Sequence, residues 1–137
     1  MTMIQMVDEP GGASAYRAGA CNIGPAEIRR RRAFGLFAAA VTVVLAVILV
    51  ATGSPSWMRL LIFFSAAGAA VGFLQARYRF CVSFAIAGVS NFGPLGREDR
   101  VTDAADHRAD LAVAVKILAL SAAVGAVVAV GFALLPV

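Results

Sequence analysis

Charged side chains are scarce in this sequence, at 15% of residues against 61% that are hydrophobic. Soluble domains carry roughly 25% charged residues, so this composition favours a membrane protein before any segment is considered. Acidic residues are fewer than basic ones, which gives a formal net charge of +4. The basic residues adjoin apolar stretches and do not cover a folded soluble surface. We therefore expect membrane lipid, and no nucleic acid, as their partner.

Cysteine and histidine are also rare, since the chain has only Cys21, Cys81 and His107. These side chains alone cannot complete a tetrahedral zinc site, so we expect no metal site. Both cysteines fall in segments assigned below to the cytoplasmic side of a membrane, where thiols stay reduced. We therefore expect no structural disulfide.

Enzyme motifs are missing as well. The sequence contains no nucleophile with a matching base, no paired carboxylates in an apolar stretch, no phosphate loop and no dinucleotide fingerprint. We therefore expect no catalytic activity, no catalytic residue and no cofactor. The first thirty residues contain Asp8 and Glu9 and lack the apolar run of a cleavable signal, so the amino terminus is expected to persist.

Long apolar stretches are what the sequence does contain. A helix needs roughly 20 apolar residues to cross the hydrocarbon core of a bilayer. With their flanking residues, the stretches predict membrane spans at about 34–53, 58–75 and 111–134. The predicted fold is an all-α membrane protein with three transmembrane helices and a short interfacial or re-entrant segment between the second and third.

The basic residues predict the topology. The short loop after the first span carries Arg59 as its one basic residue, and the other eleven of the twelve Lys and Arg lie toward the opposite side. The positive-inside rule then places the amino terminus in the cytoplasm and the carboxyl terminus outside, in a bacterial inner membrane. Four arginines directly before the first span are candidate lipid-headgroup contacts: Arg29, Arg30, Arg31 and Arg32.

Within this plan, residues 1–24 form a cytoplasmic tail and 25–137 a single transmembrane domain. Pro25, followed by Glu27, predicts a helix start at Pro25. That helix either continues into the first span or breaks near Gly35. Residues 80–92 are the expected interfacial segment, and 93–110 a solvated loop, helical from Thr102 with the Thr102 hydroxyl as its cap.

Small residues recur at helical spacing in the later spans. Gly68 and Gly72 lie four apart in the second, and Ser121 and Gly125 four apart in the third. Small side chains let helix backbones approach closely in lipid, where van der Waals packing drives association. These four residues are predicted to pack helices together, either within the bundle or against another membrane protein.

One segment order resembles a known family. Asn22-x-Gly24 and Glu27-x-x-x-Arg31 precede a hairpin of two spans, and Cys81 follows with Gly88 beyond. This order, over about residues 21–92, is similar to the YgaP-like transmembrane domain, a small two-helix inner-membrane module. The chain departs from it by lacking proline after Cys81, by its third span and by having no rhodanese domain. The resemblance therefore implies no sulfurtransferase activity.

A second, local resemblance surrounds Cys81. The run Gly72 to Cys81, with Gln75, Arg77 and Arg79 inside it, looks like the cysteine motif of the YeeE/YedE sulfur-transport family. That resemblance implies passage of a sulfur species between cysteines, in proteins with many more helices. Cys81 and Cys21 are accordingly candidate reactive thiols, and the alternative is that both are small packing residues.

Two functions follow from this sequence. The first is a non-enzymatic accessory or assembly subunit of a larger membrane complex, with other membrane proteins or further copies of the chain as partners. It is favoured by spans almost without ionisable residues and by faces of small residues. The alternative is a thiol-dependent carrier or permease component for a sulfur species that uses Cys81.

Overall fold

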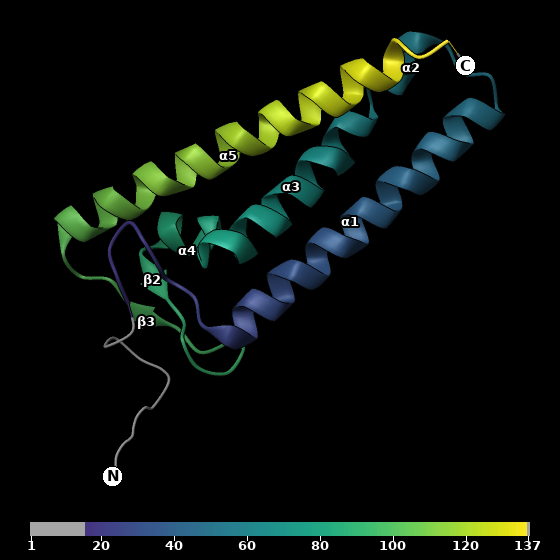
Figure 1. Ribbon diagram of the computed structural model, residues 1–137. Helices are drawn as coiled ribbons and strands as arrows, with labels where there is room; N and C mark the ends of the chain where they lie inside the picture. Colours follow the sequence, from purple (N-terminus) through teal and green to yellow (C-terminus); the bar gives the residue numbers. More distant parts are fainter. Residues whose placement is uncertain (1–15, 137) are drawn as a thin grey trace.

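A computed structural model describes residues 16–136 of the protein (Figure 1). Three segments are helices long and apolar enough to cross a membrane: Pro25–Ala51, Ser56–Tyr78 and Ala104–Ala133. The elements in chain order are α1 (Pro25–Ala51), α2 (Ser56–Arg59), α3 (Ile62–Tyr78), α4 (Val82–Ala87), β2 (Val89–Ser90), β3 (Asp99–Arg100) and α5 (Ala104–Ala133).

The three long helices lie side by side, with α3 between α1 and α5 (Figure 1). Helix α4, the strands and residues 16–24 gather at one end of this bundle, where α1 begins and α3 ends. That end carries Arg29 to Arg32, Arg77 and Arg79, and we call it the arginine end. Helix α2 and the end of α5 lie at the other end, where Arg59 Nη1 donates to the Leu135 carbonyl at 3.0 Å.

Helix α1 begins at Pro25, as the proline at the first helical position predicts, and it continues past Gly35 without a break. Gly35 is buried because α3 lies directly against it. The open choice between a continuous helix and an interfacial break is therefore decided in favour of the continuous helix.

The all-α prediction is wrong in one detail, because the arginine end contains a short strand pair. Val89 and Ser90 pair antiparallel with Arg100 and Asp99. Helix α4 ends at Gly88, whose φ of 75° is left-handed and stops the helix. The chain then turns back before residue 99, and the two extended segments satisfy each other's backbone groups.

The start of the last helix also differs from the prediction. Asp103, and not Thr102, is the residue that caps α5, since its carboxylate accepts from the backbone N–H groups of Ala105 and Asp106. A carboxylate satisfies two of the orphan donors and also complements the positive end of the helix dipole. Residues 104–110 are therefore the first turns of α5, which begins two residues after the expected start at Thr102.

A small hydrophobic core joins α4 to the ends of α3 and α5. Phe80, Val82 and Ala85 are buried in it together with Ala114 and Ile117 of α5. Farther along the bundle the long helices keep many large apolar side chains exposed, among them Val43, Val47 and Ile48 of α1. Lipid-facing helices have this pattern, because hydrocarbon solvates such side chains as well as a protein core does.

Candidate functional site: a buried thiol held by an arginine

Cys81 follows the end of α3 and precedes α4, and its backbone is fixed by the side chain of Asn22. Asn22 Oδ1 accepts from the Cys81 N–H at 2.7 Å, and Asn22 Nδ2 donates to the Cys81 carbonyl at 3.1 Å. Asn22 is itself fully buried. Because every hydrogen bond is expensive to break without water nearby, this pair ties the segment before α1 firmly to the start of α4.

A second side chain, Gln75 of α3, holds the turn from the other direction. Gln75 Oε1 accepts from the Val82 N–H at 2.7 Å, and the Gln75 carbonyl accepts from the Phe80 N–H at 2.9 Å. Helix α3 stops at Arg79, which has a left-handed backbone with φ of 54°. The Cys81 side chain is thus presented from a turn whose backbone is held on both sides.

The Cys81 sulfur is in contact with a charged side chain. Arg31 Nη2 donates to Cys81 Sγ at 2.8 Å, and the Ser83 hydroxyl lies 3.2 Å from the same sulfur. A charge-assisted hydrogen bond of this kind suits the thiolate, which is the nucleophilic form of cysteine. Cys81 is 1% exposed, so the contact is shielded from bulk water.

The arginine is held in turn by a buried acid. Arg31 Nη1 donates to Glu27 Oε1 at 2.8 Å, one helical turn away on α1. Asn91 Nδ2 donates to the other carboxylate oxygen at 3.0 Å, and Glu27 is 1% exposed. The Arg31 guanidinium also lies 5.5 Å from the centre of the Phe84 ring. One arm of the arginine therefore neutralises a buried carboxylate while the other reaches the thiol.

The thiol lines a cavity of about 450 Å³. Its polar wall is formed by Arg30, Arg31, Gln75, Cys81 and Ser83, and the remaining wall by apolar side chains such as Phe34 and Leu118. A wall of this composition suits a small molecule that has an anionic or sulfur-containing group and is otherwise apolar. We call this constellation of a thiol, its arginine partner and the cavity the Cys81 site.

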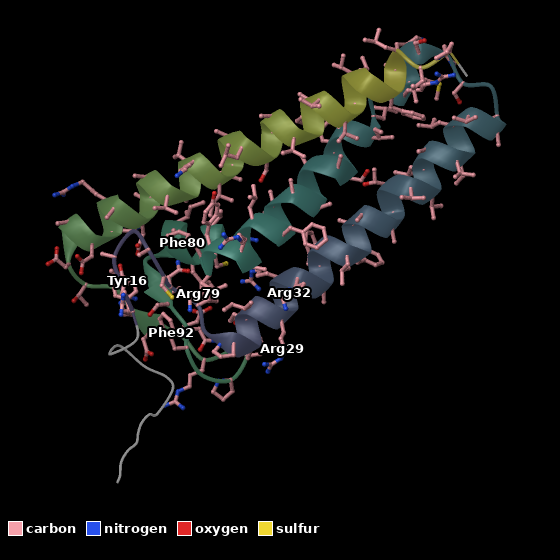
Figure 2. All side chains as sticks on the ribbon, in the orientation of Figure 1. Tyr16, Arg29, Arg32, Arg79, Phe80 and Phe92 are labelled. Carbon is pink, nitrogen blue, oxygen red and sulfur yellow. The ribbon has the colours of Figure 1, made fainter. Side chains whose placement is uncertain are left out.

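The four candidate headgroup arginines are not equivalent. Arg29, Arg30 and Arg32 are exposed and remain available to lipid, and Figure 2 shows Arg29 and Arg32 on α1 at the arginine end. Arg31 turns inward to Glu27 and Cys81. The second candidate thiol, Cys21, is half-buried and does not line the Cys81 site. Its Sγ lies 3.6 Å from the Ile23 carbonyl, and burial raises the pKa of this thiol.

The candidate packing residues also separate in the structure. A Cβ at Gly72 would lie 2.6 Å from the Gly35 nitrogen, and one at Gly125 would lie 2.9 Å from the Ala67 Cβ. These two glycines therefore sit where α3 meets α1 and α5. Ser121 is buried on the same face of α5 as Gly125. Gly68 has no neighbouring atom within 4 Å of a Cβ position.

The sequence named Cys81 as a candidate thiol. The two family resemblances included Asn22, Glu27, Arg31 and Gln75, but the contacts of these residues around Cys81 were not predicted. The four-residue spacing of Glu27 and Arg31 on a helix was an available signal for their ion pair. The Asn22 contact joins residues 59 apart in sequence, and no local pattern announces it. Within residues 16–136, no group of three His, Cys, Asp or Glu side chains is placed to hold a metal ion.

The chain was compared with models of protein families, with curated proteins and with solved structures, and none of the three comparisons finds a match. The similarities to the YgaP-like and YeeE/YedE families therefore gain no support from them. What the protein does has to be argued from the Cys81 site itself.

Proposed function

We propose that the protein is a membrane subunit that accepts a sulfur atom on Cys81 and passes it on. The observation that carries this proposal is the 2.8 Å contact from Arg31 Nη2 to Cys81 Sγ, inside a site of buried polar side chains. A cysteine that only packs needs no guanidinium, and burying an arginine beside it carries a desolvation cost. The arrangement is the one expected of a reactive thiol.

The proposed step is transfer of sulfane sulfur from a hydropersulfide, RSSH. The Cys81 thiolate attacks the outer sulfur, a new S–S bond forms, the old S–S bond breaks, and RS⁻ leaves. The products are the Cys81 hydropersulfide and the donor thiolate, so no separate oxidant is needed. Arg31 and Ser83 are placed to hydrogen-bond negative charge at the sulfur. The same step in reverse delivers the sulfur to an acceptor thiolate.

The accessory-subunit hypothesis belongs to the same proposal, because three helices in one layer cannot surround a path across a membrane. Helix α3 is flanked by α1 and α5, and apolar side chains of α1 remain exposed. Other membrane proteins, or further copies of this chain, would complete such a path. The placement of eleven of the twelve basic residues supports a bacterial inner membrane with the arginine end in the cytoplasm.

The test uses purified full-length protein carrying Cys21→Ala, so that Cys81 is the one thiol. We expect incubation with a small-molecule hydropersulfide to add one sulfur atom to Cys81, as measured by intact mass. Cys81→Ser should add none while keeping its helical circular dichroism. Arg31→Lys keeps the charge but cannot reach Glu27 and Cys81 together. Its rate of sulfur uptake should fall about tenfold, for a loss of roughly 1.4 kcal/mol.

Arg32→Lys is the matched control, since Arg32 is the exposed neighbour of Arg31. Its uptake should equal that of the parent protein. A folded protein whose Cys81 gains no sulfur would refute the carrier role and leave the non-enzymatic accessory role. That role predicts co-elution with other polypeptides in mild detergent, which native mass analysis measures.

A further inference from the structure

A second cavity at the arginine end, of about 590 Å³, shares no lining residue with the Cys81 site. Its wall includes three arginines, Arg17 from the segment before α1 and Arg77 and Arg79 from the end of α3. Figure 2 shows Arg79 at this end of the bundle, in the same region as Tyr16 and Phe92. Segments far apart in the sequence thus bring positive charge to one hollow.

No acidic side chain of the described residues pairs with these three guanidinium groups. Between residues 16 and 136, none of the three takes part in an ion pair or a side-chain hydrogen bond. Three like charges around one cavity repel one another, and an anion between them would remove that repulsion. The Arg31 guanidinium, by contrast, has its carboxylate partner in Glu27.

The beginning of α1 adds to the positive potential. Gly24, Pro25 and Ile28 line the cavity, and Gly24 as the N-cap has no side chain to satisfy the first N–H groups of the helix. The amino end of a helix carries about half a positive charge and binds anions through such free N–H groups. This helix is long, so its dipole is fully developed at Pro25.

Arg79 occupies a backbone conformation that its side chain does not favour. It is the only residue other than glycine with a positive φ among residues 16–136, at 54°. A glycine would adopt this conformation without strain. Strain of this kind concentrates at functional sites, where the side chain contributes something that offsets it.

The Cys21 thiol lines the cavity together with Arg79 and Arg17, and it reports their electrostatic effect. Burial raises the pKa of the Cys21 thiol, and the guanidinium groups of Arg79 and Arg17 act against that rise. Both charges are therefore close enough to stabilise an anion beside Cys21.

We propose that this cavity binds a tetrahedral oxyanion, either the phosphate of an anionic lipid headgroup or a free phosphate ion. A guanidinium group can donate two parallel hydrogen bonds to the paired oxygens of such an anion. Three guanidinium groups and a helix amino end carry more positive charge than one carboxylate would neutralise, which suits a phosphate. The cavity lies at the arginine end, where α1 begins, and this position suits either source. The site uses neither Cys81 nor Arg31, so its test is independent of the sulfur proposal.

The experiment measures thermal unfolding of the full-length protein carrying Cys81→Ser. One arm adds inorganic phosphate in an uncharged detergent, with chloride at equal ionic strength as the reference. The other arm compares nanodiscs of phosphatidylcholine with and without phosphatidylglycerol. A ligand that binds the folded state raises the unfolding temperature by mass action. Arg79→Gln should weaken the affinity for the anion about tenfold, since one charge-assisted hydrogen bond is lost. The same rise in unfolding temperature should then need about ten times more ligand.

Arg108→Gln is the matched control, because Arg108 is an exposed arginine near the start of α5 that neither lines the cavity nor belongs to the four candidate headgroup arginines. Its response should equal that of the parent protein. A response to phosphate that depends on Arg79 supports a free oxyanion, and one confined to phosphatidylglycerol supports a headgroup. Should Arg79→Gln fail to fold, Arg77→Gln replaces it. The proposal is overturned by no response in either arm, or by equal weakening in Arg108→Gln.

Discussion

Replacing Gly72 by alanine should separate α1 from α3 and destabilise the protein. A Cβ at this position would lie 2.6 Å from the Gly35 nitrogen, 2.7 Å from its Cα and 3.0 Å from the Arg31 carbonyl oxygen. Non-bonded atoms pack at about 3.5–4.0 Å, so the two helices must move apart by roughly 1 Å at this point. All three opposing atoms are backbone, which cannot turn aside as a side chain can.

The expected cost follows from that geometry. Overpacking of a fitted interior costs about 1–3 kcal/mol, and a clash with backbone belongs at the upper end, about 3 kcal/mol. Gly35→Ala meets the ring of Phe73 at 3.0 Å, which can rotate, so its cost should be about 1 kcal/mol. Gly68→Ala meets nothing within 4 Å. It should be neutral or stabilise the helix by up to about 1 kcal/mol, because alanine is the better helix former.

The assay is equilibrium unfolding in mixed micelles, followed by circular dichroism, for the three variants and the parent. A second readout links packing to the site, since Arg31 belongs to the stretch of α1 that must move. In a Cys21→Ala background, Gly72→Ala should speed alkylation of Cys81, and Gly68→Ala should not. Equal stability of Gly72→Ala and Gly68→Ala would refute the packing described for α1 and α3.

Three further predictions concern the contact between Tyr16 and Asp110 and the membrane topology. Asp110 is fully buried and accepts hydrogen bonds from the Tyr16 hydroxyl at 2.6 Å and the Gly19 N–H at 2.8 Å. Asp110→Ala should therefore lower the free energy of unfolding by about 1–3 kcal/mol and speed hydrogen exchange at residues 16–21. Burial, followed by the hydrogen bond to Asp110, raises the pKa of Tyr16. The protonated Tyr16 hydroxyl therefore stabilises the folded state fully below the ordinary pKa of about 10, and this stabilisation is lost as the pH rises above it. Hydrogen exchange at residues 16–21 should accelerate above that pH, and Tyr16→Phe should abolish the pH dependence. For the topology, Ser54→Cys should react with a membrane-impermeant maleimide added to intact cells and Cys21 should not; the reverse pattern would invert the assignment.

The sequence reaches the site only in part. Cys81 was a candidate because the run Gly72 to Cys81, with Arg77 and Arg79 inside it, resembles a sulfur-transport motif. The arginine that contacts its sulfur is instead Arg31, from a different helix. Arg77 and Arg79 instead line the other cavity. Proximity along the chain indicated the right kind of chemistry but the wrong partner. Helix α3 ends at Tyr78 and the chain turns at Arg79, so residues close to Cys81 in sequence line a different cavity.

By itself the sequence determined three helices long and apolar enough to cross a membrane, the start of α1 at Pro25 and the small residues suited to close helix contact. These features depend on hydropathy, backbone sterics and side-chain size, which act over a few turns of one helix. Only the tertiary structure decided that Gly72 meets Gly35 while Gly68 faces open space, and that Asn22 holds Cys81 across 59 residues. Residues four apart on a helix differ by about 40° in direction, so which one touches a neighbour depends on where that neighbour lies. Long-range polar contacts likewise exist only after the helices have packed and excluded water, because in the open chain each of these groups is hydrogen-bonded to solvent.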